Sequence, residues 1–85
     1  MTTAIVILNW NGENYLQQFL PILIEKTTFP NVEIIVADNA STDNSLKIMK
    51  AEFPTVRTIV LDKNYGFAGG YNQALAQVEA DYYVL

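Results

Sequence analysis

Short apolar runs rich in β-branched residues most strongly constrain what this chain can fold into. Three of them are Thr3 to Asn9 (TAIVILN), Val32 to Ala37 (VEIIVA) and Val56 to Leu61 (VRTIVL). A fourth run, Asp81 to Leu85 (DYYVL), has the same character. Near-continuous apolar runs of this length are expected of strands that are buried on both faces. The sequence therefore predicts four strands, of which the first two are buried on both faces.

Segments with helical spacing separate these runs. Glu13 to Thr27 places apolar residues at helical intervals, and Pro21 within it predicts a kink or the start of a second helical segment. A second helix is predicted from about Thr42 to Glu52, and a third from about Gly69 to Val78. The order β-α-β-α-β-α-β predicts an α/β fold: an open parallel sheet with right-handed crossovers and helices on both faces, as in half of a Rossmann-like fold.

Length and composition limit the class of protein. Eighty-five residues suit one small domain, and a hydrophobic content of 51% argues against disorder. The net charge is −4 with scattered basic residues, so no nucleic-acid partner is expected. No apolar stretch approaches the roughly 20 residues of a membrane span, and no signal-peptide pattern is present. A cytoplasmic location is the default expectation.

The last apolar run ends without a polar residue or a turn. We therefore expect residues 1–85 to be the N-terminal part of a longer domain, truncated after the fourth strand.

The absence of two residue types narrows the chemistry. The chain has no histidine and no cysteine, which excludes Ser-His and Cys-His nucleophile pairs and a zinc site of the usual ligand types. Any chemistry must use carboxylates, hydroxyls, amides, backbone dipoles or a group that this chain lacks.

Polar clusters follow the first three predicted strands. They are Asn9-Trp10-Asn11, then Asp38-Asn39, then the glycine-rich stretch NYGFAGGYNQAL from Asn64 to Leu75. In open α/β sheets, ligands bind beyond the carboxyl ends of the strands, and these ends meet at one edge. Each cluster also has a purely structural interpretation, as turn, helix cap or close packing. Together at one edge they favour a binding site.

The residue types in these clusters suit a nucleotide. Trp10 offers a flat apolar face, and base–aromatic stacking contributes about 1–3 kcal/mol. Asp38 or Asn39 can bind the edge of the base or the ribose hydroxyls. Glycines let the backbone approach a sugar or phosphate, and a helix N-terminus favours an anion. No lysine or arginine lies within the glycine-rich stretch, so a divalent cation would be the natural partner of a diphosphate, with ligands from elsewhere.

Four stretches, VILNWNG, IIVADNASTDNS, NYGFAGGYNQAL and DYYVL, together resemble family 2 glycosyltransferases with the GT-A fold. The resemblance implies a nucleotide-sugar donor and a saccharide, glycoconjugate or lipid-linked acceptor, as in polysaccharide biosynthesis. It also implies Mg²⁺ or Mn²⁺ on a D-x-D type motif beyond Leu85, and inversion by a carboxylate base that also lies beyond Leu85. GFAGGYN resembles the rhamnosyltransferase-like branch of the family.

The resemblance also implies roles for individual residues. Trp10 resembles the aromatic residue that stacks on the base, and Asp38-Asn39 resembles the acidic pair that binds base and ribose. Asn39 stands where aspartate is commoner, which leaves a thymidine or guanosine donor open. Tyr71 stands where an arginine often precedes the asparagine that corresponds to Asn72. The nucleotide-sugar-binding residues predicted here are Asn9, Trp10, Asn11, Asp38, Asn39, Gly66, Gly69, Gly70, Tyr71 and Asn72, with no catalytic residue and no metal ligand among them.

Other interpretations stay open at this point. Asp43 resembles a recurrent acid of the family, but a favourable interaction with a helix dipole explains it equally. The chain could be a non-catalytic nucleotide-binding or regulatory α/β module. It could also be a scaffold whose exposed last strand and apolar faces favour self-association. As part of a glycosyltransferase, it is expected to be inactive alone and to belong to a cytoplasmic or membrane-peripheral protein.

Overall fold

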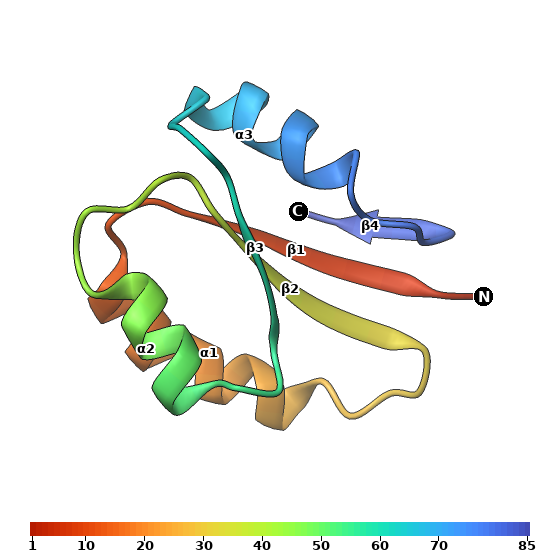
Figure 1. The fold of residues 1–85 in the computed structure, drawn as a ribbon. Coiled ribbons are helices and arrows are strands. Elements are labelled where there is room, and N and C mark those ends of the chain that lie inside the picture. Colours follow the sequence, from red (N-terminus) through yellow and green to blue (C-terminus); the bar gives the residue numbers. More distant parts are fainter.

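Four parallel strands form one sheet that lies between two layers of helices (Figure 1). The computed structural model describes residues 1–85. The strands, in the spatial order β3-β2-β1-β4, are β1 (Thr3–Asn9), β2 (Val32–Asp38), β3 (Arg57–Val60) and β4 (Tyr82–Val84). The helices are α1 (Glu13–Lys26), α2 (Ser45–Glu52) and α3 (Gly66–Leu75). The predicted α/β class, element order and parallel sheet are confirmed.

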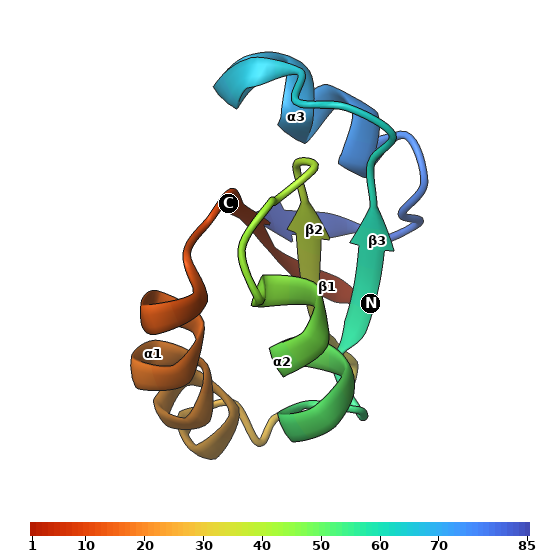
Figure 2. The same ribbon diagram turned by 60° about the vertical axis from the view of Figure 1, so that its left-hand side comes forward.

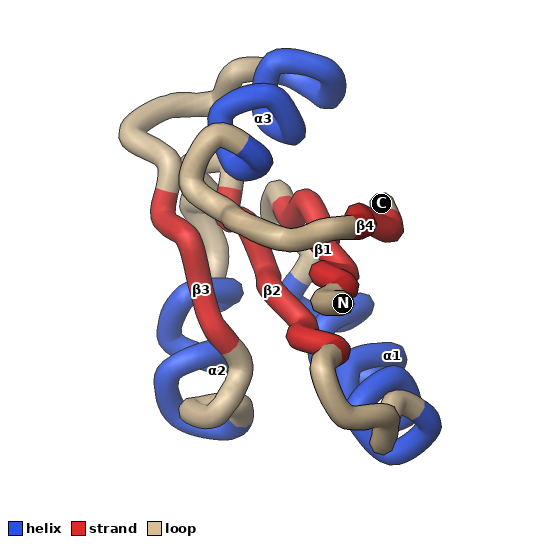
Figure 3. Tube along the Cα trace, turned by 90° about the vertical axis from the view of Figure 1, so that its right-hand side faces the viewer, coloured by secondary structure: helices blue, strands red, loops and turns tan.

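The two faces of the sheet are covered by different helices (Figure 2). Helices α1 and α2 follow β1 and β2 and lie on one face, whereas α3 lies on the other before the chain returns to pair β4 with β1. Figure 3 shows the strands between these two layers. No helix is both long enough and apolar enough to cross a bilayer.

Alternation along the strands explains why both faces are apolar. Side chains at successive positions point to opposite faces, so Ile35 packs toward α3 while Val36 packs toward α1 and α2. The runs of β1 and β2 therefore have no polar side, as predicted, whereas all three residues of β4 are exposed. The buried cluster on the α3 face contains Ala4, Val6, Ile35, Ala37, Ile59, Leu61, Ala74 and Val78, and the cluster on the other face contains Leu16, Leu20, Val36, Ile48, Met49 and Phe53.

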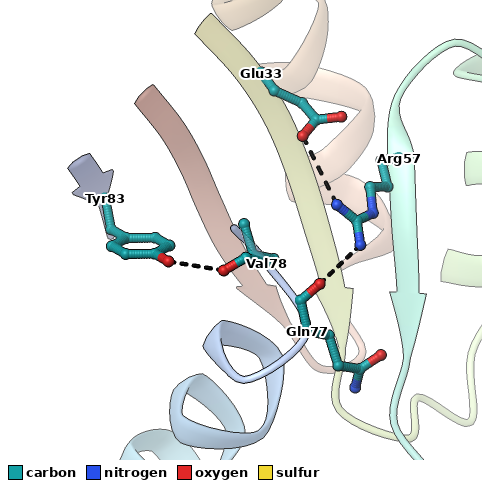
Figure 4. A network of polar contacts seen from close by, with 5 residues as sticks. All are labelled: Glu33, Arg57, Gln77, Val78 and Tyr83. Carbon is teal, nitrogen blue, oxygen red and sulfur yellow. Dashed lines mark hydrogen bonds and ion pairs between the residues drawn. The ribbon is translucent and has the colours of Figure 1, made fainter. Parts of the chain in front are cut away.

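The segment that follows α3 is fixed by polar contacts from β3 and β4 (Figure 4). Arg57 donates a hydrogen bond of 2.9 Å to the carbonyl oxygen of Gln77 and lies 3.8 Å from the carboxylate of Glu33. The Tyr83 hydroxyl donates to the carbonyl oxygen of Val78 at 2.7 Å. The ion pair is exposed and contributes little by itself. Together these contacts fix where α3 ends relative to the sheet.

The two ends of the chain are joined by hydrogen bonds. The backbone N–H of Thr2 donates to Oδ2 of Asp81 at 2.7 Å. The N–H groups of Asp81 and Tyr82 donate to the carbonyl oxygen of Thr2 at 3.0 Å each. This contact sets the register of β4 against β1.

Helix α2 begins later than predicted. It starts at Ser45 rather than at about Thr42. The N–H groups of Thr42 and Asp43 both donate to the side chain of Asn11, in the loop after β1. These long-range contacts hold residues 41–44 in a non-helical loop.

Helix α3 begins three residues before the predicted position. Its first residue is Gly66, whose φ of 76° directs the chain into the helix. Residues 66–68, which precede the predicted helix, therefore form its first turn. Helix α1 runs unbroken through Pro21, whose side chain is exposed. Solvent can satisfy the carbonyl that loses its partner there, so no second segment forms.

Candidate functional site

The carboxyl end of β2 is joined to the end of β1 through a buried carboxylate. Asp38 has an exposed fraction of 1%. Its Oδ1 accepts hydrogen bonds from Asn9 Nδ2 at 3.0 Å and from the Ser41 hydroxyl at 2.7 Å. Its Oδ2 accepts from the N–H of Ser41 at 2.9 Å. Asp38 and Asn9, both predicted site residues, thus bond to one another.

Asn39 joins the end of β2 to the start of α3. Its side-chain nitrogen donates to Asn64 Oδ1 at 3.1 Å and to the carbonyl oxygen of Gly66 at 3.0 Å. Its Oδ1 accepts from the N–H of Tyr65 at 3.0 Å. Every polar group of this buried side chain has a partner within the chain. An aspartate here would lack the donor that reaches Gly66.

Asn11 joins the loop after β1 to the loop after β2. Its φ of 51° is a left-handed conformation that asparagine tolerates better than most residues. Its Oδ1 accepts from the N–H groups of Thr42 at 2.7 Å and Asp43 at 3.2 Å. Its own N–H donates to the Ser41 hydroxyl at 2.9 Å. The predicted site residue Asn11 therefore directs its amide oxygen at a neighbouring loop.

Asp43 bonds to the first residues of two helices. Its Oδ2 accepts from the N–H of Glu13 at the start of α1, at 3.1 Å. Its Oδ1 accepts from the N–H of Ser45 at the start of α2, at 2.9 Å. Partial burial alone would raise the pKa of Asp43, but hydrogen bonds from Ser45 and Glu13 outweigh it and lower the pKa. A charged carboxylate also suits two positive helix ends.

Trp10 presents an accessible aromatic ring at the same edge. Its exposed fraction is 56%, and it lines an apolar groove of about 620 Å³ along α1. Tyr15 and Phe19 line the same groove and stack on each other with ring centroids 5.5 Å apart. The groove thus begins at the polar network, through Asn9 and Trp10, and continues along the α1 face.

The glycines of α3 serve different structural purposes. Gly66 is exposed and has a positive φ, and a Cβ there would meet nothing within 4 Å. A Cβ on Gly70 would lie 2.8 and 2.9 Å from the two methyl groups of Leu8. A Cβ on Gly69 would lie 3.1 Å from the Cβ of Tyr65. Gly66 is thus needed for backbone conformation and Gly70 for close packing of helix on strand.

The remaining predicted site residues lie along α3. The Tyr71 hydroxyl accepts a hydrogen bond of 3.3 Å from the N–H of Leu8, and its ring meets the exposed Phe67 ring edge-to-face at 5.2 Å. Asn72 is exposed. Tyr71 therefore contacts β1 from the α3 face, whereas Trp10 lines the groove on the α1 face.

The three loops meet at one edge of the sheet, at the left of Figure 1. Hydrogen bonds connect five predicted residues, directly or through their loops, and the Trp10 ring is exposed beside them. Contact of any predicted residue with a ligand stays a prediction. The five connected residues are Asn9, Asn11, Asp38, Asn39 and Gly66.

Ser41 and Asn64 are members of this network that were not predicted as site residues. Ser41 bonds to Asp38 and Asn11, and Asn64 accepts from both Asn39 and the N–H of Gly66. The Asn64–Gly66 bond is an Asx turn, and the Asn-x-Gly pattern would have signalled it. No comparable local pattern marks Ser41, because its partners include a residue 30 positions away.

The residues at this edge do not fit a divalent cation. No group of three or more acidic, histidine or cysteine side chains lies close enough to share an ion. The oxygens of Asp38 and Asp43 already accept hydrogen bonds from the loops. The arrangement can instead present an aromatic face and a helix N-terminus to a ligand.

Comparison with known sequences identifies glycosyltransferases as relatives of this chain. The model of the family described as glycosyl transferase family 2 matches residues 4–85. An uncharacterized glycosyltransferase of Bacillus subtilis is 33% identical over 84 residues, which cover 95% of this chain and 21% of that protein. An N-acetylglucosaminyl-diphospho-decaprenol L-rhamnosyltransferase of Mycobacterium tuberculosis is 30% identical over 74 residues, covering 87% of this chain and 24% of that protein. The chain thus spans only a fifth to a quarter of these relatives.

Solved structures with the same fold include complexes with a nucleotide or a nucleotide sugar. Staphylococcus aureus TarS residues 1–349, in complex with UDP, superposes with a TM-score of 0.78 and 28% identity over 99% of this chain and 27% of that one. The mannosyltransferase PcManGT of Pyrobaculum calidifontis, in complex with GDP-Man and Mn²⁺, gives a TM-score of 0.74 at 19% identity over 93% of this chain and 25% of that one. The second likeness is one of fold alone.

Proposed function

This chain belongs to glycosyl transferase family 2, and from that membership we propose that it forms the donor-nucleotide part of a glycosyltransferase. The enzyme transfers a sugar from a nucleotide-sugar donor to a saccharide or glycoconjugate acceptor. Because the chain spans about a fifth to a quarter of its relatives, this proposal concerns a longer protein.

One observation carries the proposal. The loops after β1, β2 and β3 are joined by hydrogen bonds at the carboxyl edge of the sheet, and Trp10 is exposed there. Ligands bind at this edge in open parallel sheets. The UDP complex of TarS, a structural relative at 28% identity, supports a nucleoside diphosphate as the ligand class.

In this proposal, the residues at the carboxyl edge have different roles. The Trp10 ring stacks on the base, since a flat apolar face suits any nucleobase. Asp38 and Asn39, which are buried, hold the loops that form the rim. The N-terminus of α3 begins at Gly66 with exposed residues and favours the diphosphate through its dipole and the N–H groups of its first turn, apart from that of Gly66, which donates to Asn64.

Three further features belong to the longer protein in this proposal. Transfer is inverting, with a carboxylate base outside these 85 residues. A divalent cation is bound by ligands that also lie outside them, since the residues here do not fit one. The protein is cytoplasmic and works at the membrane periphery if its acceptor is lipid-linked; the mycobacterial relative is named for a decaprenol-linked compound.

Calorimetric titration of the 85-residue chain with UDP, GDP and dTDP tests the proposal. We expect at least one of them to bind, and Trp10→Ala to weaken that binding by about 5-fold to 100-fold, as the loss of one stacking contact predicts. Phe29→Ala is the matched control, because Phe29 is an exposed aromatic residue (69%, against 56% for Trp10) in the loop before β2, at the opposite edge of the sheet. Absence of any binding heat, or equal losses in both variants, would contradict the proposal.

A further inference from the structure

We propose that Asn11 and Asp43 are positioning residues that hold Trp10 in a fixed place at the carboxyl edge of the sheet. The inference deepens the proposed function and rests on it for the identity of the ligand, a nucleoside diphosphate whose base stacks on Trp10. That these two residues immobilise the Trp10 ring is inferred from their hydrogen bonds alone, whichever ligand binds.

The orientation of the Trp10 ring is not fixed by a hydrogen bond of its own side chain. No hydrogen bond holds its indole nitrogen, and 56% of the residue is exposed. Its orientation must therefore come from its backbone and from packing in the groove. The backbone before it is fixed because the carbonyl oxygen of Asn9 accepts from the N–H of Asn39 at 2.8 Å.

The backbone after Trp10 is fixed by the loop that follows β2. Asn11 accepts from two consecutive N–H groups of that loop, those of Thr42 and Asp43, and donates its own N–H to Ser41. Its Nδ2 also donates to the Thr42 hydroxyl at 3.2 Å. Asn11 thus bonds to three consecutive residues of the neighbouring loop, to Ser41 through its backbone and to Thr42 and Asp43 through its side chain.

Asp43, in the loop that follows β2, makes a second set of contacts with the segment after Trp10. We call Asn11 and Asp43 together the clamp. Neither α1 nor α2 is capped by the side chain of its own N-cap residue, Gly12 or Asn44. The Asp43 carboxylate bonds to the first N–H of each helix instead. A carboxylate that only capped α2 would make no hydrogen bond to α1. Asp43 therefore links the two helix starts, and Trp10 lies between Asn9 and this link.

A fixed ring favours binding because an immobilised side chain loses less conformational entropy when the ligand docks. Loosening the clamp should leave the ring in place on average and increase its motion. The variants should therefore weaken nucleotide binding through Trp10 mobility, without any loss of a direct contact.

Trp10 is the only tryptophan in the chain, so its fluorescence reports this motion without a label. Time-resolved anisotropy is measured for the 85-residue chain and for Asn11→Gly and Asp43→Ala, with circular dichroism to verify folding. Glycine adopts the positive φ of position 11 freely and removes only the amide. Asn14→Ala is the matched control, since Asn14 is exposed on α1 and makes no side-chain hydrogen bond.

We expect both variants to increase the fast local motion of Trp10 about 2-fold or more and to weaken UDP or GDP binding about 5-fold to 10-fold. Asn14→Ala should change neither quantity. Asn11→Asp retains the acceptor oxygen and should restore most of the rigidity.

Unchanged Trp10 motion in both folded variants overturns the clamp, as does an equal increase in Asn14→Ala. If Asp43→Ala fails to fold, Asp43→Asn, which keeps one acceptor oxygen, is measured in its place and decides in the same way. If neither nucleotide binds the unaltered chain, the proposed function fails, while the anisotropy still decides whether Asn11 and Asp43 hold the ring.

Discussion

The side-chain amide of Asn39 donates a hydrogen bond of 3.0 Å to the carbonyl oxygen of Gly66, the first residue of α3. This bond ties the end of β2 to a helix that begins 27 residues later in the chain. It depends on a donor, which an asparagine has and an ionised aspartate lacks.

Asn39→Asp should therefore destabilise the fold. The new carboxylate would face two acceptor oxygens, those of Asn64 and Gly66, in a buried position. We expect a loss of about 1–3 kcal/mol in the free energy of unfolding, measured by urea denaturation. Asn14→Asp makes the same chemical change at an exposed position and should stay within about 0.5 kcal/mol of the unaltered chain. Equal effects in the two variants would refute the role assigned to Asn39.

Stability should fall in acid partly through Asp43. Its pKa in the folded chain lies below the ordinary value of 3.8, because hydrogen bonds from Ser45 and Glu13 outweigh the effect of burial. A depressed pKa means that the carboxylate stabilises the fold above its unfolded pKa and loses this contribution as pH falls through the folded pKa. Of the two residues that bond to it, only Glu13 is ionisable, and Glu13 bonds through its N–H.

The measurement compares the unfolding free energy of the chain and of Asp43→Asn from about pH 6 to about pH 2. The difference between them should be largest above the ordinary pKa and should shrink below it. A difference that is constant with pH would show that the charge of Asp43 does not matter. Asp62→Asn is a useful comparison, since the Tyr65 hydroxyl lowers the pKa of that exposed carboxylate at a site away from the clamp.

Gly70→Ala should destabilise the chain although alanine is the better helix former. The added methyl would lie 2.8 and 2.9 Å from the Leu8 methyl groups and 3.0 Å from Asn39 Nδ2. Overpacking of this kind costs about 1–3 kcal/mol, which exceeds the gain of about 1 kcal/mol in helix propensity. Thermal and urea denaturation check it. Gly69→Ala meets a single atom at 3.1 Å and should be less destabilising, so the reverse order would contradict the packing role.

The isolated chain should self-associate through the α1 face. Tyr15, Phe19 and Ile22 are each more than half exposed beside the apolar groove. Exposed apolar patches of this kind favour association. Sedimentation velocity should show a concentration-dependent increase in mass that Phe19→Lys reduces and Phe29→Lys does not. A monomer at every concentration would contradict this.

The 85-residue chain alone should transfer no sugar, even where it binds a nucleotide. Asp38 and Asp43 both accept hydrogen bonds from the loops, and no acidic cluster is present to bind an ion. Mass spectrometry of a reaction with UDP-glucose or GDP-mannose and a mixture of saccharide acceptors checks this against heat-denatured chain. Product above that background would show that a catalytic group lies within these residues.

The sequence alone predicted every strand and helix because their signals are local. Apolar runs such as TAIVILN and the helical spacing of Leu16 and Leu20 are visible within a few residues. The convergence of the loops also followed, since parallel strands place their carboxyl ends together.

What could not be predicted depends on distant partners. Helix α2 starts at Ser45 because Asn11 binds the residues before it, and no local pattern shows a contact across 31 positions. The glycine-rich stretch became the start of a helix because Asn39 fixes Tyr65 and Gly66 from another strand. Asp38 and Asn39, which are predicted to bind a nucleotide, are buried in this network, and their burial is likewise not visible in a local pattern.

The contact between Thr2 and Asp81 also has a consequence for folding during synthesis. During synthesis on the ribosome, β1 emerges first of these four strands and its neighbour β4 emerges last of them, with 79 residues between the two partners of that contact. Pairings between such distant segments form slowly and leave strand edges open to other chains in the meantime. The edge of β1 that pairs with β4 therefore stays without its partner strand until residues 82–84 have been synthesised.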